Sequence, residues 1–129
     1  MKLNSLLPNA HYDMVHGEPA VIEKDNDGSF LYRLNIAPEY GKDEETGEQV
    51  QIGWSCYETR CWGNPEKAVI EKAVIRSVVD DCAEFALVNK YNKHVLGIVE
   101  DEQAVTEYKE YLQFTADLER QIIEDLANV

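Results

Sequence analysis

Cysteine and histidine are the side chains of this 129-residue chain whose spacing first suggests chemistry. Four residues separate Cys56 from Cys61, and four separate His11 from His16. Zinc sites usually place such pairs on two tight turns, whereas Cys56 alternates with Trp54 as an inward-facing strand residue does. The pattern favours thiols that pack as small apolar residues. It leaves open a metal-binding protein or a cysteine-dependent enzyme built from these thiols and imidazoles.

Carboxylates are abundant, but their positions indicate neither a calcium site nor a catalytic one. Counting Gly28 as the sixth position of a calcium loop puts Leu34 at the twelfth, where a bidentate Glu is required. Residues 25–28 (DNDG) instead predict a hairpin turn. Phosphate loops, nucleophile elbows and zinc-protease helices are missing. We therefore expect a non-enzymatic protein with no catalytic residue, no metal and no cofactor.

Aromatic and arginine side chains are the more suggestive group, because these types are favoured anchors of protein interfaces. Five of them lie in or beside the expected strands, and we predict that they form a partner-binding patch: Tyr40, Tyr57, Trp62, Arg33 and Arg60. The alternative, equally open, is that they close the edge of the core.

Three strands are expected to carry these residues, over residues 19–24, 29–37 and 48–60, after an irregular N-terminal arm over residues 1–18. Alternation places the apolar residues of the second strand on one face, namely Phe30, Tyr32, Leu34 and Ile36. The same rule places four residues of the third strand on that inner face, namely Val50, Ile52, Trp54 and Cys56. Pro38 is expected to end the second strand, with an exposed acidic connection up to Gly47.

Three helices are expected after the strands, over residues 65–79, 81–94 and 101–127. Asn64 and Pro65 provide a helix start, and Gly97 a break before the last helix. The core stripe of that helix includes either Tyr111 or Leu112. The order of elements predicts one α+β domain over residues 19–129, in which a three-stranded antiparallel meander precedes three helices packed on one sheet face.

The net charge limits which kinds of partner the chain can bind. Asp and Glu number 25 against 12 Lys and Arg, a formal net charge of −13, so free nucleic acid is excluded as a partner. A basic protein partner or self-association is expected instead. Acidic mimicry of nucleic acid is a further alternative, although lysines interrupt the acids at Lys24, Lys67, Lys72, Lys90 and Lys93.

No segment approaches the ~18–20 consecutive apolar residues of a membrane helix. Asn4, Ser5 and Pro8 interrupt the N-terminal apolar residues, so a signal peptide is not expected. Three cysteines are an odd number, which argues against a disulfide framework. These observations predict a cytoplasmic protein without a membrane partner.

The helical part has a pattern of three segments. Residues 71–77 (EKAVIRS) end in an Ile-Arg-Ser turn, residues 81–90 (DCAEFALVNK) follow, and residues 107–114 (EYKEYLQF) close the pattern. In this pattern the chain resembles small, uncharacterised prophage-encoded proteins from phage structural and tail-region gene sets. The resemblance covers about residues 66–125 and brings no catalytic residue. It implies a structural or accessory protein, virion-associated if phage-derived, that works as an interaction or assembly module.

Overall fold

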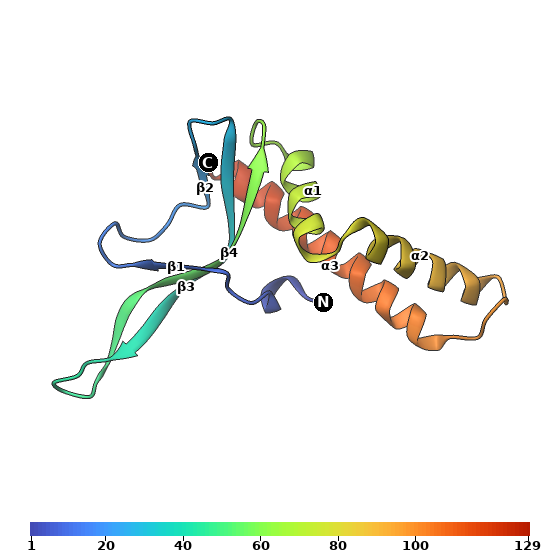
Figure 1. Cartoon of the computed structure of the whole chain (residues 1–129), viewed down its shortest axis with the longest axis horizontal. Helices are drawn as coiled ribbons and strands as arrows, with labels where there is room; N and C mark the ends of the chain where they lie inside the picture. Colours follow the sequence, from blue (N-terminus) through green and yellow to red (C-terminus); the bar gives the residue numbers. More distant parts are fainter. The chain divides into compact units, whose positions relative to one another are not determined.

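The computed structural model describes all 129 residues and divides them into two compact units. The sheet unit comprises Leu6–Pro65, and the helical unit comprises Met1–Ser5 and Glu66–Val129. Figure 1 shows the strands in the first unit and the helices in the second. The predicted α+β class is confirmed. The single domain and the packing of the helices on one sheet face stay predictions.

The sheet has four antiparallel strands in the order β1-β4-β3-β2. They are β1 (Ala10–Asp13), β2 (Ile22–Lys24), β3 (Ser29–Lys42) and β4 (Gln49–Trp62). The last three form the predicted meander. The prediction of three strands was wrong, because β1 lies in the N-terminal arm, where we expected no regular structure. A four-residue strand is too short to show alternation, and its pairing with β4 makes it a strand.

The hairpin of β3 and β4 is longer than predicted. Pro38 does not end β3, which continues to Lys42 with Pro38 opposite Trp54. β2 pairs with β3 only up to Tyr32. On the side of β3 away from β4, no strand lies beside Pro38, so the amide hydrogen that proline lacks is not needed there. The turn itself is short, and in it Gly47 N donates to Asp43 O at 2.8 Å.

A bulge in β3 changes the register of the outer hairpin. Asn35 adopts a φ of 55°, and between the pairs Leu34↔Tyr57 and Ala37↔Ser55 two residues of β3 stand opposite one of β4. Before the bulge, Phe30, Tyr32 and Leu34 share a face, the Phe30 face, with the residues across from them, which are Cys61, Thr59 and Tyr57.

Trp54 and Cys56 consequently lie on the opposite face, the Arg33 face, so our prediction that they share the inner face with Phe30 was wrong. Both faces contain buried residues, since Phe30, Cys56 and Arg33 are 0%, 0% and 2% exposed. Alternation of apolar residues along β4 therefore does not identify its inner face.

The helical unit contains α1 (Lys67–Val78), α2 (Asp81–Val95) and α3 (Glu102–Ala127), preceded by a single 3-10 turn, η1 (Leu3–Ser5). The three predicted helices are thus confirmed to within a few residues. Asp80 caps α2 by accepting from Ala83 N at 2.7 Å, and Asp101 caps α3 by accepting from Ala104 N at 3.2 Å. None of the three helices combines the length and apolar character needed to span a lipid bilayer.

Both α1 and α2 lie alongside α3, which supplies most of the buried residues of this unit (Figure 1). The buried residues of α3 are Ala104, Tyr111, Phe114, Leu118 and Ile122. Of the two alternatives for the core stripe, Tyr111 is buried and Leu112 is exposed. α1 buries Ile70 and Val74, whereas α2 has no buried side chain.

Gly53 lies where β1 approaches β4 very closely. A Cβ atom built on Gly53 would lie 1.9 Å from the backbone oxygen of Tyr12, far inside contact distance. The absence of a side chain at this position therefore lets β1 pair with β4.

We expect the substitution Gly53→Ala to separate β1 from β4 and to lower the free energy of unfolding by about 1–3 kcal/mol. Amide hydrogen exchange of Ala10–Asp13 measures the separation directly. Gly41→Ala is the matched control in the same hairpin, because its new Cβ meets only the flexible side chain of Ile52, at 3.1 Å. Unchanged protection of β1 in Gly53→Ala would contradict this close approach.

Candidate functional site

A buried arginine organises the Arg33 face of the sheet. Arg33 Nε donates to Glu58 Oε1 at 2.9 Å, and Nη1 donates to the backbone oxygen of Ala20 at 2.9 Å. Its Nη2 donates to Tyr12 Oη at 2.9 Å and to Glu23 Oε1 at 3.2 Å. The guanidinium carbon also lies 4.8 Å from the centre of the Tyr12 ring. Four of the five N–H groups of Arg33 are thus engaged inside the sheet unit.

The electrostatics of this cluster follow from burial and pairing. Burial, and next the hydrogen bond that the phenol donates to Glu58, raises the pKa of Tyr12. Burial by itself lowers the pKa of Arg33, but the bonds to Tyr12 and Glu58 outweigh it and raise that pKa overall. The cluster therefore keeps a charged guanidinium and a neutral phenol, which is a structural arrangement and offers no free acid or base.

The side chain of Asn9 extends this attachment of the N-terminal segment to β4. Its Nδ2 donates to the backbone oxygen of Glu58 at 2.9 Å, and its Oδ1 accepts from the backbone nitrogen of Glu58 at 2.7 Å. The side-chain amide of Asn9 thus makes the same two hydrogen bonds to the backbone of β4 that another backbone residue added to β1 would make.

The five predicted contact residues fall in three places. Arg33, Arg60 and Trp62 share one face, where Arg33 is buried and Trp62 is 63% exposed. Tyr57 lies on the Phe30 face, and Tyr40 lies in the outer part of the hairpin, 54% exposed. The structure therefore does not gather these residues into one patch.

Arg60 is bound at the turn between β2 and β3. Its Nη1 forms an ion pair with Asp25 Oδ2 at 2.7 Å and donates to Ser29 Oγ at 2.6 Å. Ser29 Oγ in turn donates to Asp27 Oδ1 at 2.5 Å. These bonds hold the predicted DNDG turn against β4.

The cysteines do not form a common site. Cys56 and Cys61 lie on opposite faces of β4, so the two thiols cannot bind one metal ion. No group of three or more His, Cys, Asp or Glu side chains in the chain is arranged to hold a metal. Burial raises the pKa of Cys56, and it raises the pKa of Cys61 to about 11. Both thiols are therefore poor nucleophiles at neutral pH.

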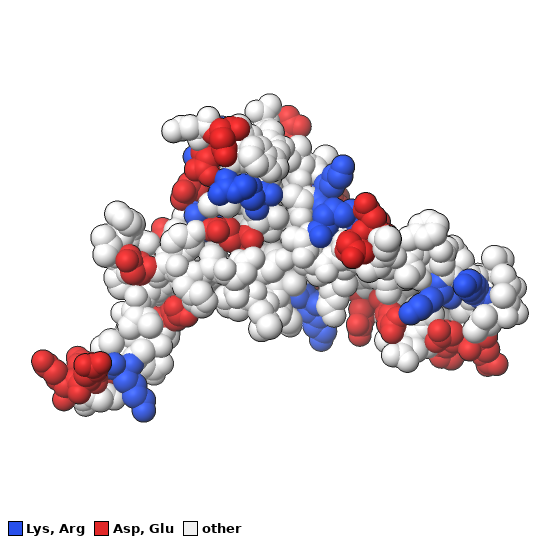
Figure 2. All heavy atoms as spheres, in the orientation of Figure 1, with Lys and Arg blue, Asp and Glu red and all other residues white.

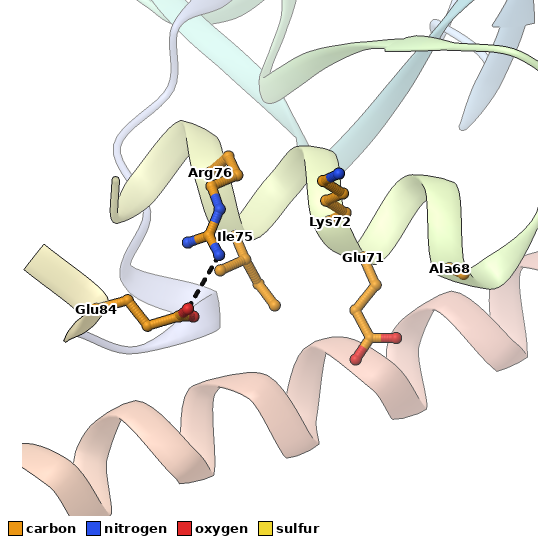
Figure 3. Close-up of a pocket in the computed structure, with 6 residues that line it drawn as sticks. All are labelled: Ala68, Glu71, Lys72, Ile75, Arg76 and Glu84. Carbon is orange, nitrogen blue, oxygen red and sulfur yellow. Dashed lines mark hydrogen bonds and ion pairs between the residues drawn. The ribbon is translucent and has the colours of Figure 1, made fainter. Parts of the chain in front are cut away.

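A second hydrogen-bond chain joins the three helices. A hollow of about 290 Å³ is lined by Arg76 of α1 and Glu84 of α2. In Figure 3 the side chain of Glu84 points toward that of Arg76. Arg76 Nη2 donates to Glu84 Oε1 at 2.9 Å, and the phenol of Tyr111 on α3 donates to Glu84 Oε2. The bond from Arg76, and next that from Tyr111, lowers the pKa of Glu84. The carboxylate is therefore ionised and engaged, as expected of a structural ion pair.

The feature that sequence reasoning missed is the outer part of the hairpin. Residues 37–42 of β3 and 49–53 of β4, here called the ribbon, extend beyond the pairing with β2. Val50 and Ile52 are 39% and 49% exposed in it. One signal was present in the sequence: residues 49–57 form a run of nine without charge, in a chain that is 29% charged.

We expect Arg33→Met to lower the free energy of unfolding by about 3 kcal/mol or more, because it leaves Glu58 largely buried without its cation. Chemical denaturation measures this loss. The double substitution Arg33→Met/Glu58→Met should recover part of it, since no unpaired charge is left. Arg60→Met is the control, because its ion pair with Asp25 is partly exposed and screened by water, so the loss should be much smaller. Equal losses at the two arginines would contradict the dominant role of Arg33.

The pKa of Tyr111 predicts how stability depends on alkaline pH. Burial, and next the bond to Glu84, raises this pKa from 10.0 to about 12. The stabilisation is fully present below pH 10 and is lost as the pH rises toward 12, by up to about 2 kcal/mol. Thermal unfolding between pH 9 and pH 12 should show a steeper decline in the wild type than in Tyr111→Phe. Parallel declines would show that Tyr111 does not titrate in this way.

Comparisons with known proteins find no relative of this chain. No protein-family model matches it, no curated protein matches it and no solved structure matches it. Its function is therefore inferred from its own residues and their geometry.

Proposed function

We propose that the chain is a non-enzymatic protein-interaction module, and that the ribbon is its contact element. The observation that carries this proposal is the open edge of β4 over residues 49–52. β1 covers β4 only from Gly53 to Cys56, so four ribbon residues before Gly53 have no strand beside them on that edge.

The two edges of the ribbon differ in a way that favours pairing at β4. Sheet edges are commonly protected from other chains by proline and by charged side chains. The β3 edge carries both, with Pro38, Glu39 and Lys42, whereas residues 49–53 (QVQIG) carry neither. A partner strand would therefore add to β4, and its side chains would meet Val50 and Ile52.

The ribbon also lacks support within the sheet unit. A two-stranded hairpin alone is only marginally stable in water, and here neither β1 nor β2 reaches residues 38–42 and 49–52. An added strand from another protein would supply backbone hydrogen bonds and cover the exposed aliphatic side chains. This need for a third strand supports binding by strand addition.

Charge indicates which kind of partner fits. Figure 2 shows acidic side chains gathered at the tip of the β3–β4 hairpin, where the turn contributes Asp43, Glu44 and Glu45. With a net charge of −13, the chain attracts basic surfaces and repels acidic ones. We therefore propose a basic partner protein with an accessible strand edge. Because the helical part resembles prophage proteins, we propose that this partner is a phage structural protein.

The test compares the wild type with the ribbon variant Val50→Lys/Ile52→Lys on a solid support, using extract of the source cells. We expect the wild type to retain a basic protein that the ribbon variant does not retain. That protein, once purified, should bind the wild type with a Kd that rises with salt. Amide exchange at residues 49–53 should slow in the complex.

Val15→Lys is the matched control, because Val15 is a 77% exposed apolar residue of the same unit outside the ribbon. It should retain the partner as the wild type does. Equal retention by all three proteins, retention of only acidic proteins, or no retention by the wild type would each contradict the proposed function.

A further inference from the structure

The α2 helix has an apolar face that the helical unit leaves uncovered. Cys82 and Phe85 are exposed, Phe85 to 69% of its surface, and no side chain of this helix is buried. A helix in a compact protein normally buries an apolar stripe. The stripe on α2 is therefore available to another molecule.

The contacts between α2 and α3 show where that face lies. The phenol of Tyr111 donates to Glu84, and the rings of Tyr91 and Tyr108 lie 4.7 Å apart between centroids, so these residues form the inside of an antiparallel hairpin. Figure 1 shows α2 alongside the first half of α3.

Phe85 and Leu112 lie on the same side of this hairpin. Phe85 follows Glu84 on α2, and Leu112 follows Tyr111 on α3. One position along a helix turns the side chain by about 100° around the helix axis. Because the helices run in opposite directions, the two rotations point to the same side. Leu112 is 46% exposed, so the two side chains form one apolar patch across the hairpin.

The charges around this patch balance. Helical spacing brings eleven further side chains near it, at three, four or seven positions along the same helix from Phe85 or Leu112, which are Asp81, Cys82, Val88, Asn89, Asn92, Val105, Tyr108, Lys109, Thr115, Ala116 and Glu119. Arg76 pairs with Asp81 and also with Glu84, at 2.5 and 2.9 Å. Glu119 pairs with Lys67 at 2.9 Å, and Lys109 offsets the remaining acid. In a chain of net charge −13, such a face allows two copies to approach with little repulsion.

We propose that a second copy of this chain covers the patch, and that two α2–α3 hairpins form a four-helix bundle with two-fold symmetry. Two antiparallel helices with an exposed apolar side are half of such a bundle. In a two-fold arrangement Phe85 of each copy packs against Leu112 of the other, so one patch is sufficient for both. The proposal involves residues distinct from the ribbon and does not depend on the function proposed for it.

The solution mass over a concentration series, measured by sedimentation equilibrium, tests this contact. We expect the wild type to reach twice the chain mass of 14.7 kDa. Phe85→Lys/Leu112→Lys should raise the dimer Kd by about a hundredfold or more, because each dimer loses two buried Phe and two buried Leu contacts. Phe85→Ala should raise it by about tenfold or more without adding charge.

The ribbon variant Val50→Lys/Ile52→Lys is the matched control, since it also replaces two exposed apolar residues by lysine. It should dimerise as the wild type does. Circular dichroism should show unchanged helix content in every variant, because the substituted side chains are exposed. A wild type that stays monomeric, a dimer that survives Phe85→Lys/Leu112→Lys, or a dimer lost equally in the ribbon variant would overturn the proposal.

Discussion

The buried guanidinium of Arg33 is the interaction on which the sheet unit depends. A charged group removed from water requires a partner for its N–H groups. Arg33 finds these partners on segments far apart in the sequence: Tyr12 on β1, Ala20 before β2, Glu23 on β2 and Glu58 on β4. They meet only when β1 pairs with β4 and β2 pairs with β3. A polar cluster therefore helps to hold the N-terminal segment to the rest of the sheet.

That cluster also explains which parts of the sheet were predictable. The alternation of Phe30, Tyr32 and Leu34 correctly predicted a strand with a buried face. The same rule assigned Cys56 to the wrong face. Alternation assumes that one face of the sheet is buried and the other is exposed to solvent, whereas Arg33 and Cys56 are buried on the face opposite Phe30. The cross-strand register decides the face of each residue. The bulge at Asn35 shifts the register only beyond Leu34 and Tyr57, and it left no recognisable signal in the sequence.

The helices were more predictable than the surfaces that they expose. Capping by Asp80 and Asp101 is a local property, and period 3.6 follows from one chain segment alone. Exposure depends on what the rest of the unit covers. Phe85 has the spacing of a core residue, yet its side chain is 69% exposed. Of the sequence neighbours Tyr111 and Leu112, only Tyr111 is buried, and its phenol bonds to Glu84. A contact surface made of uncovered apolar residues is therefore visible only after folding.

The placement of acids gives the two proposed surfaces different partners. The uncharged edge of β4 leads to an acidic turn with Asp43, Glu44 and Glu45, so two ribbons would repel each other near their tips while a basic protein would be attracted. Beside the α2–α3 patch, three acids (Asp81, Glu84 and Glu119) are offset by three bases (Arg76, Lys67 and Lys109). Identical copies therefore meet at the hairpins more readily than at the ribbons. In these proposals, repulsion between the acidic tips disfavours contact between two ribbons, and the balanced charge beside the α2–α3 patch permits contact between two hairpins. Self-association and partner binding would then use different surfaces.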